Sequence, residues 1–157
     1  MEVNTRETIL AHVATAVAAE TNPQRAMERV VAVLKQQMPS YTWVWIYVLE
    51  ADELVLGPFL GKPSPHTRIP LGRGICGAAA TERQTIIVDD VNDDPRYLAC
   101  SLETASEIVV PIMDADRVLG EIDIDSDRRA NFDADHRTLL EAVARLLAPK
   151  LATTVNL

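Results

Sequence analysis

The chain has 157 residues, 48% of them hydrophobic and 24% charged, which is typical of one globular domain and not of a disordered or fibrous chain. Its formal net charge of −8 argues against nucleic acid and anionic membranes as partners, because both bind through cationic side chains. No apolar run is long enough to span a bilayer, and the first residues lack the pattern of a signal peptide. We therefore expect a cytoplasmic protein whose partner is a small molecule or another protein.

The chain is predicted to begin with two helices. Residues 2–19 place apolar side chains at helical spacing, so this helix needs a surface to pack against. Asn22 is a suitable N-cap and Pro23 a suitable first residue for a second helix, which is expected to end near Met38 because Pro39 follows.

Strands are predicted through the middle of the chain. Residues 42–50 carry β-branched and aromatic side chains at both alternating sets of positions, as a central strand covered on both faces requires. A turn leads to a second strand over 53–61, and a proline-rich loop leads to a short strand over 67–70. An alanine-rich helix is expected over 74–81, followed by a strand over 85–90.

The strongest hairpin signal lies in residues 106–127, where two apolar strands flank an Asp-containing turn. Asp133 can then cap a C-terminal helix. Helices at both ends and hairpins between them indicate an α+β domain with a largely antiparallel sheet and the terminal helices on one face. We interpret the chain as a single domain, 1–157, with N-terminal helices (1–39), sheet and site loops (40–130) and a C-terminal helix (131–157).

The chain has two cysteines, Cys76 and Cys100. Cys76 follows Gly-Arg-Gly at the start of the alanine-rich helix, where free N–H groups and the helix dipole stabilise a thiolate and lower its pKa. It is therefore a candidate reactive thiol. The alternative is that both cysteines are small buried hydrophobic residues. In a reducing compartment they are more plausibly free or redox-cycling thiols than a structural disulfide.

Acidic residues gather in the second strand of the last hairpin. Glu121, Asp123 and Asp125 alternate with isoleucines, so they share one face of that strand, and Glu107 on the neighbouring strand can join them. Crowded carboxylates raise at least one pKa, which allows proton donation near neutral pH or binding of an ammonium group. The alternative is an ordinary solvated face over a buried apolar one.

Aromatic side chains share a face of the first strand. Trp43, Trp45 and Tyr47 could form a wall for a ligand, although packing in the core is the stronger expectation. His66, in the loop before the short strand, is either a polar loop residue or an acid or base. The cysteines and histidines have no CxxC or HExxH spacing, so no metal site is predicted; one would have to be assembled from residues distant in sequence.

Several motifs together resemble one known family. The free methionine-R-sulfoxide reductases, which are GAF-domain enzymes, are similar to this chain in the order and separation of five segments: LGPFLGK, RIPLGRGICGAAA, YLAC, SEIVVPI and GEIDIDS, within about residues 40–150. The resemblance implies a GAF fold with about six antiparallel strands, commonly dimeric through its helices. It also implies that a cysteine thiolate attacks the sulfoxide sulfur, a second cysteine resolves the sulfenic acid, and thioredoxin reduces the disulfide, with no bound cofactor.

The resemblance assigns the attacking role to Cys100 and matches Cys76 to the cysteine of the glycine turn. Three positions depart from the family. His66 replaces a third cysteine that often resolves the sulfenic acid, Trp45 replaces a small residue, and Glu121 replaces an aliphatic one. With the third cysteine absent, Cys76 or an external thiol must resolve Cys100.

The resemblance also implies the substrate-binding residues. Glu107, Asp123 and Asp125 match the carboxylates that hold the amino group of the substrate and protonate the departing oxygen. Trp43 and Tyr47 match the aromatic pair against which the methyl-sulfoxide group lies.

These observations lead to one principal hypothesis and two alternatives. The principal one is the thiol-dependent reduction of free methionine-R-sulfoxide to methionine by a homodimer, with an external reductant such as thioredoxin. The first alternative is a non-catalytic GAF module that binds a small polar ligand for sensing or signalling. The second is a redox switch in which Cys76 and Cys100 form a disulfide.

Overall fold

The fold is built around one antiparallel sheet. A computed structural model describes residues 1–99 and 102–155, with side chains as far as Ala152, and within these ranges six strands form a sheet of order β3-β2-β1-β6-β5-β4. The strands are β1 (Trp43–Glu50), β2 (Glu53–Leu60), β3 (Arg68–Pro70), β4 (Ile86–Val88), β5 (Ser106–Asp114) and β6 (Arg117–Ser126). The α+β prediction, with an antiparallel sheet of about six strands, is confirmed.

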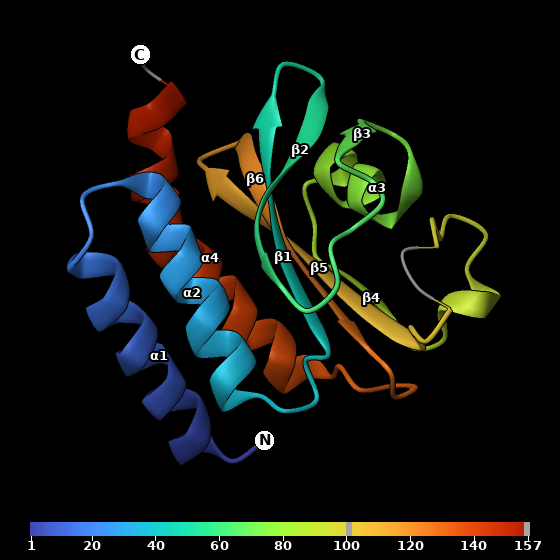
Figure 1. The fold of residues 1–157 in the computed structure, drawn as a ribbon, viewed down its shortest axis with the longest axis horizontal. Coiled ribbons are helices and arrows are strands. Elements are labelled where there is room, and N and C mark those ends of the chain that lie inside the picture. Colours follow the sequence, from blue (N-terminus) through green and yellow to red (C-terminus); the bar gives the residue numbers. More distant parts are fainter. Residues whose placement is uncertain (100–101, 156–157) are drawn as a thin grey trace.

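Helices cover both faces of this sheet, as Figure 1 shows. The helices are α1 (Val3–Ala18), α2 (Pro23–Gln37), α3 (Gly74–Glu82) and α4 (Ala134–Val155), with a 3-10 turn, η1 (Val91–Asp93). The predicted grouping of the terminal helices is confirmed, because α1, α2 and α4 lie on one side of the sheet, and α3 and the loop that contains η1 lie on the other (Figure 1).

The helix starts follow the expected capping chemistry. The Asn22 side chain accepts a hydrogen bond from the backbone N–H of Arg25, and Pro23 opens α2. The Asp133 carboxylate accepts from the N–H groups of Asp135 and His136 at the start of α4. These contacts fix where each helix begins, and hence how it meets the sheet.

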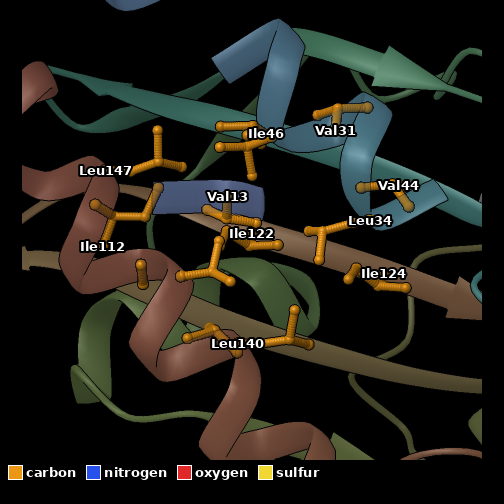
Figure 2. Close-up of a cluster of buried hydrophobic side chains, with 14 of the residues drawn as sticks. Val13, Val31, Leu34, Val44, Ile46, Ile112, Ile122, Ile124, Leu140 and Leu147 are labelled. Atoms are coloured by element: carbon orange, nitrogen blue, oxygen red, sulfur yellow. The ribbon is translucent and has the colours of Figure 1, made fainter. Parts of the chain in front are cut away.

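The main core lies between the sheet and the terminal helices, where apolar side chains from both layers interlock (Figure 2). Ile122 and Ile124 of β6 and Ile46 of β1 point into it and meet residues such as Leu34 and Leu140. Because side chains alternate along a strand, this packing sends the acidic residues of β6 to the opposite face.

That opposite face is covered as well. The aromatic residues of β1 pack with Ile75, Ala79 and Ala80 of α3 and with Val109 of β5 in a second buried cluster. The prediction that β1 is covered on both faces is therefore confirmed. In the described part of the chain, no helix combines the length and the apolar character needed to cross a membrane.

Candidate functional site

The acidic residues of β5 and β6 lie buried beneath α3. Glu121, Asp123 and Asp125 project from one face of β6, and Glu107 of β5 pairs with Asp125 in the register of the sheet. Their exposed fractions are 0%, 2% and 1% for the three residues of β6 and 5% for Glu107. The alternative of a solvated polar face is therefore wrong: four carboxyl groups are enclosed on one side of the sheet.

These carboxyl groups have few hydrogen-bond donors around them. The hydroxyl of Thr104 donates to Oδ2 of Asp125 over 2.9 Å, and the thiol of Cys76 donates to Oδ2 of Asp123 over 3.2 Å. Among the described residues, no donor reaches the other oxygen of either aspartate or either oxygen of Glu121. Thr104 could not be identified as a site residue from the sequence, because a single loop threonine forms no recognisable pattern.

Burial has a clear effect on proton binding here. It raises the pKa of Glu121 and of Asp125 well above the usual carboxyl range, and the nearby charge of Asp123 adds to both shifts. Burial also raises the pKa of Asp123, although hydrogen bonds with Glu107 and Cys76 oppose this shift. The site can therefore retain protons on carboxyl groups at a pH where exposed acids have lost them.

Cys76 is the third residue of α3, at the helix N-terminus that the sequence predicted. The predicted lowering of its thiol pKa is wrong, however. Burial raises that pKa well above its usual value, and the charges of Asp123, Glu121 and Glu107 raise it further. A thiolate at Cys76 is therefore disfavoured, because burial of the thiol and the acids beneath the helix together outweigh the helix dipole.

A small cavity adjoins the thiol. Its volume, as the space open to the centre of a water molecule, is about 10 Å³, which is enough for one water-sized occupant. Its wall includes Tyr47, His66, Cys76, Leu98, Glu107 and Asp123. The structure therefore brings together six residues from β1, α3, β5, β6 and two loops, and four of them were predicted to be catalytic or substrate-binding.

Trp43 and Trp45 do not contribute to this wall. Their rings stack on each other with centroids 6.5 Å apart and planes 6° apart, and both side chains are buried. The indole N–H of Trp45 donates to the backbone oxygen of Lys62. Trp45 is thus fixed within the apolar cluster beneath α3 and ties β1 to the loop after β2.

Tyr47 and His66 organise the loop at the other side of the cavity. The hydroxyl of Tyr47 lies 2.9 Å from Oγ of Ser64 and 3.0 Å from the backbone oxygen of His66, and donates toward both. The imidazole of His66 reaches the backbone oxygen of Ala99 through Nε2. Cys100, the predicted attacking cysteine, lies outside the described residues.

Three donors of this site could hold a metal ion. Sγ of Cys76 and one carboxylate oxygen each from Glu107 and Asp123 all lie within 4.8 Å of one another. No sequence motif marks this group, because its members come from α3, β5 and β6 and are brought together only by the fold.

The profile of the GAF domain family matches residues 6–151. The chain belongs to the GAF domain family. It is 38% identical over 138 residues to the free methionine-R-sulfoxide reductase of Escherichia coli (strain K12). The aligned region covers 87% of this chain and 82% of that relative.

Two further relatives of this GAF protein have the same name. The free methionine-R-sulfoxide reductase of Saccharomyces cerevisiae is 46% identical over 109 residues, with 67% of this chain and 60% of the relative covered. The X-ray structure of the Neisseria meningitidis enzyme in complex with its substrate is similar with a TM-score of 0.92 and 34% identity, covering 99% of this chain and 95% of that one. The resemblance inferred from the five sequence segments is confirmed.

Proposed function

We propose that this GAF protein reduces free methionine-R-sulfoxide to methionine. The observation that carries the proposal is the buried cluster of carboxyl groups beside Cys76, in a chain that is 38% and 46% identical to two enzymes of this name. An ionised carboxylate of Glu107, Asp123 or Asp125 binds the substrate ammonium, and a protonated one donates to the sulfoxide oxygen. The raised pKa values of Asp123 and Asp125 support such a division of roles.

The proposed chemistry begins at Cys100. Its thiolate attacks the sulfoxide sulfur and takes over the oxygen, which gains a proton from a carboxyl group, so that methionine leaves and Cys100 becomes a sulfenic acid. A second thiol then attacks the sulfenic sulfur, and water leaves as a disulfide forms. Cys76 is the other thiol of the chain, so it or an external thiol takes this role.

The size of the cavity places a condition on substrate binding. A free amino acid is much larger than a space of about 10 Å³, so we infer that the wall opens when the substrate enters. His66 and Leu98 are the wall residues contributed by loops, whereas Cys76, Glu107 and Asp123 lie on α3, β5 and β6. The opening is therefore expected on the loop side.

The physiological setting forms part of the same proposal. A thioredoxin-like dithiol returns the disulfide to two thiols, which fits a reducing compartment such as the cytoplasm. We also propose a homodimer, which a light-scattering measurement of the mass in solution would test. No bound cofactor takes part in these steps.

The deciding experiment measures methionine release from free methionine-R-sulfoxide with dithiothreitol or thioredoxin as reductant. Wild type should turn over, and Cys100→Ser should not; methionine-S-sulfoxide and a peptide containing methionine sulfoxide serve as substrate controls. Wild-type turnover no greater than that of Cys100→Ser would exclude the proposal. Stabilisation against heat by the amino acid without turnover would instead indicate a binding module.

A further inference from the structure

The donor cluster formed by Cys76, Glu107 and Asp123 brings one sulfur and two carboxylate oxygens close enough together for a metal ion to bind them. Its three ligand atoms lie within 4.8 Å of one another, and Sγ of Cys76 lies 3.2 Å from Oδ2 of Asp123. Tetrahedral zinc with one sulfur and two oxygen ligands has ligand separations of about 3.4–3.6 Å. A shift of about 1 Å in one carboxylate would therefore bring the donors to zinc-binding distances.

The surroundings of this donor cluster also favour a cation. Oδ1 of Asp123 is buried and accepts no hydrogen bond from the described residues. Glu121 is fully buried close to the cluster, and neither of its carboxyl oxygens accepts a hydrogen bond from the described residues. No lysine or arginine is among the described residues that line the adjoining cavity. Acidic groups enclosed in this way need protons or a bound cation to offset their charge.

We propose that Cys76, Glu107 and Asp123 bind a divalent, thiophilic metal ion, with Zn²⁺ as the ion that best matches the donors. A thiolate sulfur selects Zn²⁺, Co²⁺ or Cd²⁺ over Mg²⁺ and Ca²⁺, which prefer sites made only of oxygen. The water-sized cavity beside the cluster supplies the fourth coordination position. Because the donors project from α3, β5 and β6, the site is held by regular elements and not by a loop.

Binding is an exchange of a metal ion for protons, with no change in oxidation state. The Cys76 thiol, which donates to Asp123 in the described structure, gives up its proton to solvent and its sulfur bonds to the metal. Any carboxyl group of the cluster that still holds a proton releases it as well. At least one proton therefore appears in solution for each metal ion bound, and the affinity rises with pH.

The proposed metal site overlaps the proposed substrate site. Metal binding itself does not depend on the reductase proposal, but one consequence does. Glu107 and Asp123 cannot bind the ammonium of methionine sulfoxide while they ligate a metal. Zinc should therefore compete with the amino acid and inhibit turnover.

The test is a titration of metal-free, fully reduced protein with Cd²⁺, followed by the ultraviolet charge-transfer absorption of a thiolate–cadmium bond. One equivalent should give the absorption in wild type and in Cys100→Ser, which keeps Cys76, and none in Cys76→Ser. Competition with Zn²⁺ should remove the absorption. Asp123→Asn should weaken Cd²⁺ binding at least tenfold, whereas Asp125→Asn, equally buried on the same face of β6, should change it less than threefold.

Each outcome bears on the proposal. An absorption that persists in Cys76→Ser and disappears in Cys100→Ser, or no saturable binding in wild type, would overturn it. If Cys76→Ser does not fold, Glu107→Gln gives the same test with the thiol intact, and an unchanged Cd²⁺ affinity would then count against the site. Stoichiometric metal binding in a protein without turnover would support the metal site and reject the reductase proposal.

Discussion

Nε2 of His66 lies 3.2 Å from the backbone oxygen of Ala99, so the imidazole contacts the residue that immediately precedes Cys100. His66 also occupies the position at which the resemblance places a third, often resolving cysteine. A thiol at position 66 would therefore lie beside the segment that carries the proposed attacking thiol.

Replacing His66 by cysteine should supply a resolving thiol. In H66C, we expect oxidation by the substrate to produce a disulfide between position 66 and Cys100, and turnover with thioredoxin to rise several-fold, because the sulfenic acid meets a nearby thiol. Peptide mapping of the oxidised protein identifies the bond. His66→Ser removes the imidazole without adding a thiol and should show no gain. A map without this disulfide, together with unchanged turnover, would contradict the prediction.

Removing the Tyr47 hydroxyl should loosen the loop that carries His66. Tyr47→Phe deletes the hydrogen bonds to Ser64 and to the His66 backbone, and should cost about 1–2 kcal/mol of stability. It should also raise KM by a larger factor than it lowers kcat. Tyr41→Phe is the matched control, because its buried hydroxyl lies 2.7 Å from Nδ1 of His136 on the opposite face of the sheet. It should have a similar cost in stability and leave KM unchanged. Equal KM values for both variants would argue against a positioning role of Tyr47.

Much of the fold could be predicted from local patterns. Alternation of acids and isoleucines in β6 correctly separated its two faces, and Asn22 and Pro23 marked the start of α2. The burial of the acidic face could not be predicted in this way. This burial depends on α3 and on the segment around Leu98. The alternation of residues within β6 does not predict where these two segments lie relative to the strand.

The behaviour of Cys76 shows the same limit. Its place in the first turn of α3 followed from Gly-Arg-Gly, but the direction of its pKa shift did not. The groups that decide this direction include Asp123, which is 47 residues away in sequence and 3.2 Å away in space. A local sequence window contains the helix dipole, but it shows neither the burial of the thiol nor the carboxylates beside it, which together outweigh the dipole.

Gly120 should tolerate no side chain. A Cβ there would lie 2.3 Å from the backbone oxygen of Tyr47, so Gly120→Ala must push β6 away from β1 and should cost about 3 kcal/mol or more. Gly72→Ala is the control: its Cβ would meet nothing within 4 Å, but its φ of +83° should still cost about 1–2 kcal/mol. Urea unfolding of both variants measures the difference. A smaller loss for Gly120→Ala than for Gly72→Ala would show that the strands separate easily.

The stability of the protein should depend on pH through Glu121. Burial raises its folded-state pKa well above its unfolded value, so the native state holds a proton that the unfolded chain has released. The contribution of this residue to the free energy of unfolding is therefore full at acidic pH and falls as pH rises above about 4.3, until the folded-state pKa is reached. Near pH 8, Glu121→Gln should be more stable than wild type by about 1–3 kcal/mol.

Urea unfolding of both proteins between pH 5 and 8.5 would measure this effect as the difference between variant and wild type. His136 has the opposite effect on stability, because burial lowers its folded-state pKa and the unfolded chain binds more protons there as pH falls. This contribution is the same in wild type and variant, so it cancels in the difference. Glu50→Gln removes the same formal charge from an exposed site on β1 and controls for net charge. If the stability gain of Glu121→Gln does not increase with pH, the buried carboxyl group is not held protonated, and a cation must offset its charge.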